Sequence, residues 1–363
     1  MIEYRATTWG NGVTTDLSCR NDVEPLPNPD SRLKLPRMGD RFADEERAAL
    51  VALLEERPAM LGERAGKTSW STIASEVSLR GSALAIWQDM HPPTAPMLAL
   101  DGDIRRVDDA DLCFQLAWKQ LVEWEESTEF GLITVLDAEY PFALRGIHQM
   151  PPMLFVKGQL RADEVGVSVV GSRNATQRGL SIAARVAEGL AEREISVISG
   201  LAAGIDGAAH EAALRAGGRP IGVIGTGINR AYPAEHRELH DRVAAAGALV
   251  SQFLPDAPPT KQSFPMRNVT MSGLGRASII VEAGEHSGTR IQARVAVEHG
   301  RPVILTDFVA KTTKWGQAME GRPGVYVAGG TAEVMDIVEQ VLNEDSSDGL
   351  EVLAPSIGRP DVR

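Results

Sequence analysis

The stretch VGVSVVGSR, residues 165–173, sets the expected fold. It is an apolar run of strand length that ends in a glycine, a hydroxyl and an arginine. Short apolar runs bounded by turn residues are typical of buried strands, and such runs recur along the chain. The predicted strands are residues 132–136, 153–158, 165–170, 196–198, 221–224, 249–253, 278–281 and 303–305.

Helical patterns alternate with these strands from residue 165 onward. The predicted helices are residues 177–193, 205–216, 234–246, 290–299 and 332–342. Strands that alternate with helices of this length indicate βαβ units and a parallel sheet, and right-handed crossovers cover both of its faces. The sequence therefore predicts an α/β protein whose core, residues 131–342, is doubly wound, mostly parallel and Rossmann-like.

The rest of the chain divides by composition. Residues 1–42 are rich in Pro, Asn, Asp and Arg without periodicity, which indicates an irregular lead-in. Helical spacing at 42–61, 69–87 and 109–125 predicts a small helical domain over residues 43–130. Residues 343–363 are expected to be an acidic, flexible tail.

Composition points to a cytoplasmic protein. Two cysteines are too few for a disulfide framework, and no apolar run approaches the ~20 residues that span a bilayer. The net charge of −12 is uneven, because residues 1–130 hold 14 Lys and Arg against 23 Asp and Glu. Residues 257–301 hold six cations against three acids, so an anionic ligand can still be attracted there.

The loops that follow the predicted strands carry the candidate site. A parallel sheet presents all its strand carboxyl ends along one edge, so these loops are expected to meet in one crevice. Backbone N–H groups, hydroxyls and arginines gathered there are suited to phosphate. The candidate ligands are Gly171, Ser172, Arg173, Ser199, Gly200, Gly204, Gly225, Lys261, Phe264, Arg267, Asn268, Ser287, Gly288 and Thr289.

The stretch KQSFPMRN, residues 261–268, is the most specific of these pieces and is expected to be a proline-containing loop. Lysine and arginine can engage phosphates, phenylalanine can stack on a base, and asparagine can read a base edge. A core phenylalanine flanked by solvated charges is an equally good interpretation of this stretch alone.

Other polar residues have more ordinary interpretations. Asp206 is expected to cap a helix or orient a neighbour, and a structural hydrogen bond to His210 is favoured over a catalytic pair. Tyr232 fits a base-stacking residue or a loop anchor equally well. Glu282, Glu285 and His286 could do acid–base work, but no triad, metal set or cofactor motif accompanies them. We therefore expect a protein that is not an enzyme and that needs no cofactor or metal.

Taken in order, the loops resemble the DprA/Smf family of DNA-processing proteins. The resemblance covers about residues 133–305 and rests on the GSR, SGLAAGID, FPMRN and SGT segments at residues 171, 199, 264 and 287. It implies a Rossmann-like core that binds single-stranded DNA, a homodimer, and RecA loading during natural transformation, with RecA as a candidate partner. By position, residues 171–173 would hold a phosphate. Lys261, Phe264, Arg267 and Asn268 would line the path of the strand, and residues 287–289 would add donors.

Beyond Leu305 the chain departs from the family, which usually continues Pro-Gly-Ser where this sequence reads Thr306-Asp307-Phe308. Two alternatives stay open at this point. One is a nucleotide-binding sensor or phosphoribohydrolase-like enzyme on a related fold, for example in a defence system. The other is a regulatory scaffold whose crevice no longer binds a ligand.

Overall fold

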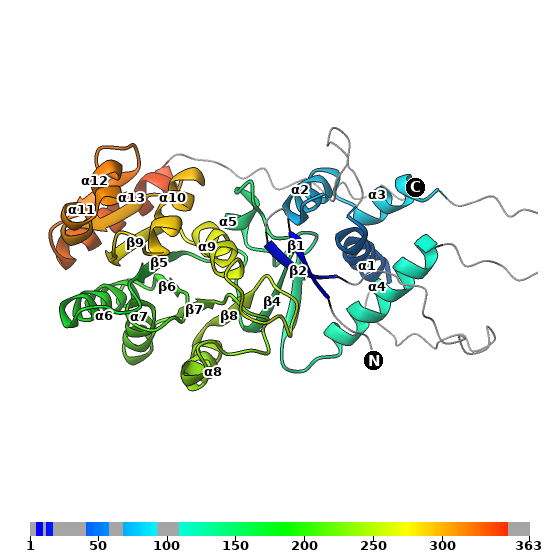
Figure 1. Ribbon diagram of the computed structural model, residues 1–363, viewed down its shortest axis with the longest axis horizontal. Coiled ribbons are helices and arrows are strands. Elements are labelled where there is room, and N and C mark those ends of the chain that lie inside the picture. The colour runs from blue at the N-terminus through cyan, green and yellow to red at the C-terminus, as the bar shows by residue number, and fades with distance from the viewer. Residues whose placement is uncertain (1–4, 10–11, 17–40, 58–67, 93–108, 348–363) are drawn as a thin grey trace, which may run out of the picture.

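A nine-stranded sheet organises the molecule (Figure 1). The computed structural model describes residues 5–9, 12–16, 41–57, 68–92 and 109–347. The strand order is β11-β10-β9-β5-β6-β7-β8-β4-β3. The strands are β3 Gly131–Thr134, β4 Met153–Gly158, β5 Gly166–Gly171, β6 Ser196–Ser199, β7 Pro220–Val223, β8 Ala248–Ser251, β9 Ala277–Glu282, β10 Val303–Thr306 and β11 Val325–Ala328.

The sheet is mostly parallel. All neighbours from β11 to β8 pair in parallel, whereas β4 runs antiparallel to β8 and β3 runs antiparallel to β4. The chain builds outward from β5 through β6 and β7 and later returns to place β9 on the other side of β5. This reversal creates a topological switch point between β5 and β9, where open α/β sheets bind their ligands. The predicted doubly wound α/β core is confirmed.

Helices cover both faces of this sheet (Figure 1). One face packs against α6 Gln177–Ala191, α7 Ile205–Arg215, α8 Arg237–Ala246 and α13 Thr331–Ser347. The opposite face packs against α9 Ser263–Leu274, α10 Thr289–Glu298 and α11 Asp307–Thr312. Side chains of β5 alternate between the two layers, with Val167 and Val169 in one cluster and Val170 in the other. Burial on both faces explains the nearly continuous Val and Ile runs that revealed these strands.

Helix α9 corrects one expectation. Residues 263–268, predicted as a loop, form the first half of this helix. The loop was predicted because proline usually interrupts a helix. Pro265 is the third residue of α9, and its missing N–H costs little there because the first-turn donors have no intrahelical partner. The residues of this stretch therefore sit on a rigid element.

Two further segments differ from expectation, and a third had no predicted structure. Residues 5–16, within the predicted irregular lead-in, contain the antiparallel strands β1 Arg5–Trp9 and β2 Gly12–Asp16. The segment that departs from the family pattern forms α11 and α12 Lys314–Met319. Helix α13 continues to Ser347, past the expected start of the tail, and residues 348–363 lie outside the described part of the chain.

The helical region before the core consists of α1 Arg41–Glu56, α2 Trp70–Arg80, α3 Ala83–Met90 and α4 Asp109–Glu125. Gly81, at a φ of 72°, ends α2 and so divides the single helix predicted over 69–87. Arg47 on α1 bonds to Glu125 at 2.7 Å and to Asp137 at 2.7 Å, which ties α1 to α4 and to the turn after β3. Trp124 packs edge-on against Phe155 of β4 at 5.1 Å. The helical region thus rests on the antiparallel side of the sheet.

Two buried histidines make stability depend on pH. His210 on α7 and His240 on α8 are almost completely buried. Burial lowers the pKa of His210 to about 3 and that of His240 to about 4. Neither ring nitrogen of His210 has a hydrogen-bond partner of good geometry among the described residues, so the expected bond to Asp206 is not formed. Both rings are neutral in the folded protein at neutral pH.

The free energy of unfolding is therefore expected to fall as the pH drops from 7 to 5. The unfolded chain binds protons at these histidines with an ordinary pKa of about 6.5, whereas the folded chain does not, which costs about 2 kcal/mol per histidine at pH 5. Urea unfolding at both pH values measures this loss. His210→Gln should flatten the dependence, and His286→Gln, at an exposed position, should leave it unchanged. An equally steep dependence in His210→Gln would contradict the assignment.

Candidate nucleic-acid interface

The candidate residues lie in or directly after the loops that follow β9, β5, β6, β7 and β8. These loops are at the carboxyl ends of the strands, and we call this end of the sheet the sheet edge. These five strands are adjacent and parallel, so their carboxyl ends lie side by side. The backbone N–H of Ser172 donates to the carbonyl of Glu282 at 2.7 Å, which joins the first two loops. The N–H of Ile205 donates to the carbonyl of Ser172 at 3.2 Å and joins the third. The loops predicted to converge do converge at the switch point.

Glycine is required where two of these loops touch. Gly204 has a φ of 79°, and a Cβ there would lie 2.3 Å from the carbonyl oxygen of Ser172 and 2.7 Å from that of Arg173. Only a residue without a side chain allows this close approach in that conformation. The contact fixes the backbone of the 171–173 loop, while the side chain of Arg173 remains exposed.

Arg173, Phe264 and Tyr232 form what we call the arginine–aromatic row. The Arg173 guanidinium lies over the Phe264 ring at 5.1 Å, and the Phe264 and Tyr232 rings are 5.4 Å apart. A Cβ on Gly225 would come within 2.8 Å of the Phe264 ring, so this glycine makes room for it. The row joins the loops after β5 and β7 to the first turn of α9, and it places a cation beside two aromatic rings.

Hydrogen bonds fix the start of α9 against the loop after β7. The Ser263 hydroxyl donates to the carbonyl of Gly225 at 2.6 Å. Ser263 and Thr260 also bond reciprocally, since each backbone N–H donates to the other's hydroxyl, at 3.0 and 3.1 Å. Lys261 is exposed in this turn, three residues before Phe264. The cation and the ring are thereby presented from one anchored turn.

Beneath the row lies a buried pair that we call the Asp206–Arg267 brace. Arg267 donates to the carbonyl of Val223 at 2.8 Å and to the side-chain oxygen of Asn268 at 3.1 Å. The Asp206 carboxylate accepts from the N–H of Gly200 at 3.2 Å. A Cβ on Gly200 would lie only 1.6 Å from the Arg267 guanidinium, so glycine is needed to admit it.

The charges of Asp206 and Arg267 act on each other's pKa. Burial raises the pKa of Asp206, which the positive charge of Arg267 and nearby backbone N–H groups partly offset. Burial lowers the pKa of Arg267, and the negative charge of Asp206 partly offsets this lowering. Each group therefore makes the charged state of the other less costly in this buried site. The brace connects the loops after β6 and β7 to α9, and it confirms the expectation that Asp206 orients its neighbours.

Several predicted ligands are inside the protein, contrary to their expected position on the path of a ligand. Arg267 and Asn268 are 6% and 8% exposed, because they turn inward from α9 to form the brace. Ser199 is fully buried, and its hydroxyl donates to the carbonyl of Val169 at 2.6 Å. Loop composition alone does not separate a residue that touches a ligand from one that supports the loop. The buried members are Ser199, Gly200, Gly225, Arg267, Asn268 and Thr289.

The loop after β9 lies beside the 171–173 loop. The Ser287 hydroxyl donates to that of Thr289 at 2.8 Å and accepts from its backbone N–H at 3.2 Å. Gly288 is exposed at the start of α10. Helix α12 supports this loop, because the Trp315 indole N–H donates to the carbonyl of Gly284 at 3.2 Å. The segment that departs from the family pattern thus buttresses the sheet edge.

The acidic residues considered for acid–base chemistry have structural contacts. Glu282 accepts the hydroxyl of Thr176 at 2.6 Å and its backbone N–H at 3.0 Å, at the start of α6. Glu285 accepts the backbone N–H of Lys314 at 2.8 Å, and His286 is exposed. Within the described residues, no group of His, Cys, Asp and Glu is placed to hold a metal ion.

The sequence comparisons identify the family. Residues 131–343 match the family of DNA recombination-mediator protein A, and the chain belongs to this family. It is 39% identical over 174 residues to the DNA processing protein DprA of Bacillus subtilis, covering 47% of this chain and 59% of that protein. It is 41% identical over 183 residues to protein Smf of Escherichia coli, covering 50% of this chain and 49% of that protein. The aligned region therefore spans only about half of these relatives.

Solved structures agree with this assignment. The chain matches the crystal structure of DNA processing protein A from Streptococcus pneumoniae with a TM-score of 0.56 and 28% identity, over 81% of this chain and 95% of that one. It also shares the fold of DNA processing protein A from Helicobacter pylori, with a TM-score of 0.52, 20% identity and coverage of 58% and 96%. The resemblance drawn from the loops is confirmed, and this chain belongs to the DprA/Smf family.

Proposed function

We propose that this protein binds single-stranded DNA along the sheet edge, with strand phosphates at the 171–173 loop and a base on the arginine–aromatic row. The observation that carries the proposal is the row itself, in which Arg173 and Phe264 lie in contact although 91 positions separate them in the sequence. A cation beside a partly exposed ring matches the alternation of phosphate and base along a single strand. The H. pylori relative is described as having a single-stranded DNA binding mode.

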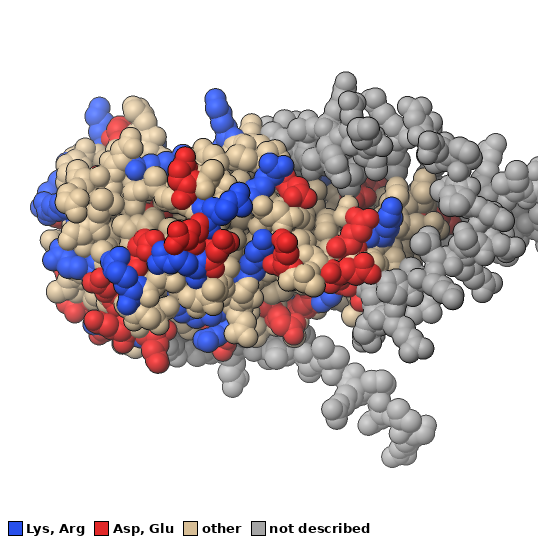
Figure 2. Space-filling model, turned by 90° about the horizontal axis from the view of Figure 1, so that it is seen from below, with Lys and Arg blue, Asp and Glu red and all other residues tan. Residues whose placement is uncertain are grey.

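The distribution of charge favours such a local site over a broad basic field. Figure 2 shows Lys and Arg interspersed with Asp and Glu over the core on the face that it views. At the sheet edge, by contrast, Arg173 is exposed and lies over the Phe264 ring, and Lys261 is exposed three residues before Phe264. Ser287 and Gly288 would add donors where the dipole of α10 favours an anion.

The buried candidates take a different part in this proposal. Arg267 and Asn268 act as positioning residues, because the Asp206–Arg267 brace holds α9, which carries Phe264 and follows the turn that contains Lys261. Gly200, Gly204 and Gly225 act by leaving space for the guanidinium, for a carbonyl and for a ring.

Family membership supports a proposal for the wider biology. We propose that the protein works in the cytoplasm as a homodimer, without catalysing a reaction, and assists RecA loading in transformation or recombination. Residues 43–130 would form a small helical domain attached to the core at 131–342. None of the helices among the described residues is long and apolar enough to cross a bilayer.

The alternative of a nucleotide-processing enzyme has less support. Its candidate base, Glu282, holds the start of α6 through Thr176, and a Cβ on Gly179 would collide with it at 2.2 Å. Glu285 is likewise engaged with α12. These contacts leave the best candidate carboxylates in structural roles.

Single-stranded oligonucleotides are expected to bind well and duplexes of the same length poorly, because paired bases cannot stack on Phe264. Fluorescence anisotropy with the two substrates, and with ATP and NAD as competitors, measures the difference. Phe264→Ala should lower single-strand affinity about tenfold, since base stacking on an aromatic side chain contributes roughly 1–3 kcal/mol. The matched control is Phe308→Ala, an exposed phenylalanine on α11. Equal affinity for duplex, or displacement of the strand by ATP, would contradict the proposal.

A further inference from the structure

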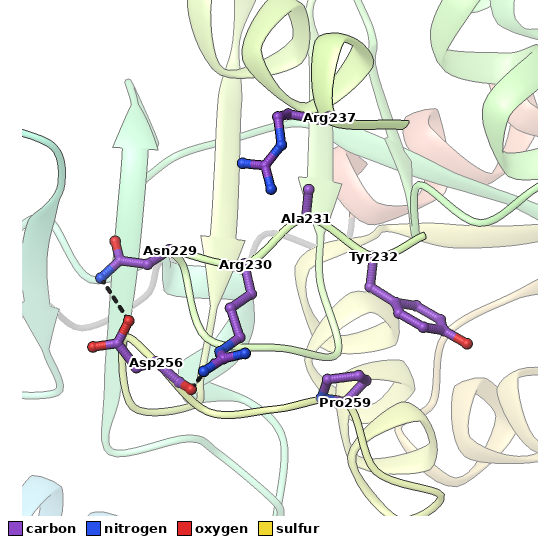
Figure 3. A pocket seen from close by; sticks show the side chains of 7 residues that line it. All are labelled: Asn229, Arg230, Ala231, Tyr232, Arg237, Asp256 and Pro259. Carbon is purple, nitrogen blue, oxygen red and sulfur yellow. Dashed lines mark hydrogen bonds between the residues drawn. The ribbon is translucent and has the colours of Figure 1, made fainter. Parts of the chain in front are cut away.

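A hollow of about 360 Å³ lies immediately beyond the arginine–aromatic row (Figure 3). It is lined by the loop between β7 and α8 and by the segment after β8, and its polar or ring-bearing residues are Asn229, Arg230, Tyr232, Arg237, Asp256 and Pro259. Binding sites for small molecules occupy about 300–1,000 Å³, so the hollow is large enough for one nucleotide. Tyr232 belongs to both features, so the hollow continues the sheet edge.

The walls of the hollow are fixed before any ligand arrives. Arg230 donates through its Nε to the carbonyl of Asp256 at 2.6 Å, and its own carbonyl accepts the Thr226 hydroxyl at 2.7 Å. The Asn229 amide donates to the Asp256 carboxylate at 3.2 Å. These bonds clamp the two lining segments together. A site whose shape is already formed loses little conformational entropy on binding.

The two ends of the hollow differ in chemistry. Figure 3 shows Arg237 at one end, and Arg230 with Asp256 and Pro259 at the other. Arg237 is exposed, and its guanidinium makes no hydrogen bond or ion pair within the described part of the chain. Asp256 is the one acid among the lining residues. It lies at the end opposite Arg237, and its negative charge would repel a phosphate from its own end. That end instead offers amide, carboxylate and guanidinium groups together with the proline ring.

From this geometry we infer that the hollow is a second subsite, which takes one nucleotide unit of the strand. The Arg237 guanidinium binds its phosphate, and its base lies toward Arg230, Asp256 and Pro259, beside Tyr232. This inference rests on the proposed binding of single-stranded DNA and adds the direction in which the strand leaves Phe264. Arg237 is the lining arginine without a partner among the described residues, and Asp256 adds one negative charge. This balance suits a phosphodiester, which carries one negative charge, better than a nucleoside triphosphate, which carries several.

The test compares Arg237→Ala with Arg242→Ala in binding titrations of the full-length protein with oligothymidylates of about 4 to 16 nucleotides, the range of single-strand site sizes. Arg242 lies on the same helix and is paired with Glu211 at 2.9 Å, so it serves as the matched control. Loss of one phosphate contact should lower affinity about fivefold at 0.1 M salt and reduce the salt slope by about 0.7. Arg242→Ala should change neither value.

A second readout does not depend on affinity. Irradiation of the wild-type complex with 5-iodouracil oligonucleotides should give an adduct on the peptide that contains Tyr232, and Tyr232→Leu should abolish it. If Arg237→Ala binds like wild type and all adducts fall at Phe264, the hollow lies off the path and the inference is overturned, while the proposed function stands. If Arg173→Ala also changes nothing, the proposed function itself fails.

A free nucleotide is the other source of the same chemistry. Thymidine monophosphate should compete with the strand only weakly, and equally for wild type and Arg237→Ala. Competition that is strong for wild type and lost in Arg237→Ala would assign the hollow to a free nucleotide and overturn its place on the strand path.

Discussion

Replacing Arg267 with methionine is expected to lower the free energy of unfolding by about 3–5 kcal/mol, the usual cost of removing one partner of a buried charge pair. Methionine roughly fills the same space, but it leaves Asp206 without its opposing charge, and it leaves the carbonyl of Val223 without a donor. Urea unfolding at neutral pH measures the loss. Because the brace supports α9, binding of single strands should weaken too, although Arg267 itself is buried.

The pH dependence of this loss identifies its cause. Without Arg267 the pKa of Asp206 should rise above its already raised value, so the variant gains stability relative to wild type as the pH falls toward the unfolded pKa of about 3.9. The deficit should therefore be larger at pH 8 than at pH 5. Asp206→Asn combined with Arg267→Met should lose less than the two single changes added together. A deficit that is the same at every pH, with strict additivity, would show that lost packing is the cause.

The largest effect on binding is expected from Arg173→Ala combined with Lys261→Ala. Both side chains are exposed at the sheet edge, so their removal should leave the fold intact. Loss of two phosphate contacts predicts a fall in affinity of roughly 25-fold at 0.1 M salt, since each contact contributes a slope of about 0.7 in log affinity against log salt. Arg185→Ala with Arg215→Ala, on α6 and α7, removes the same charge away from the sheet edge and should bind like wild type. Equal losses in both pairs would point to net charge instead of a site.

The sheet and the convergence of the loops after its strands could be predicted because they depend on local patterns. Strands β4 and β9 each contain an unbroken apolar run, residues 153–156 and 279–281, and the helices between them have clear periodicity. Glycines after the strands marked the sheet edge because close approaches such as that of Gly204 to Ser172 require them.

What could not be predicted depends on tertiary contacts. From the sequence alone Pro265 predicts a loop, and only the structure shows that it lies in the first turn of α9. The inward turn of Arg267 depends on space above Gly200 and on the charge of Asp206, which is 61 positions away. Arg230 and Arg237 were not singled out, because ordinary surface arginines carry no motif. The hollow that they line forms only when the segment containing Asp256 folds against the loop after β7.

The salt dependence of single-strand binding tests the central claim most directly. Affinity is measured from about 50 to about 200 mM salt for wild type and for the Arg173→Ala and Lys261→Ala double variant, the range over which phosphate contacts change affinity steeply. Phosphates held at the sheet edge predict a steep negative slope for wild type, and a slope shallower by about 1.4 for the double variant. Parallel slopes for the two proteins would place the strand elsewhere on the molecule.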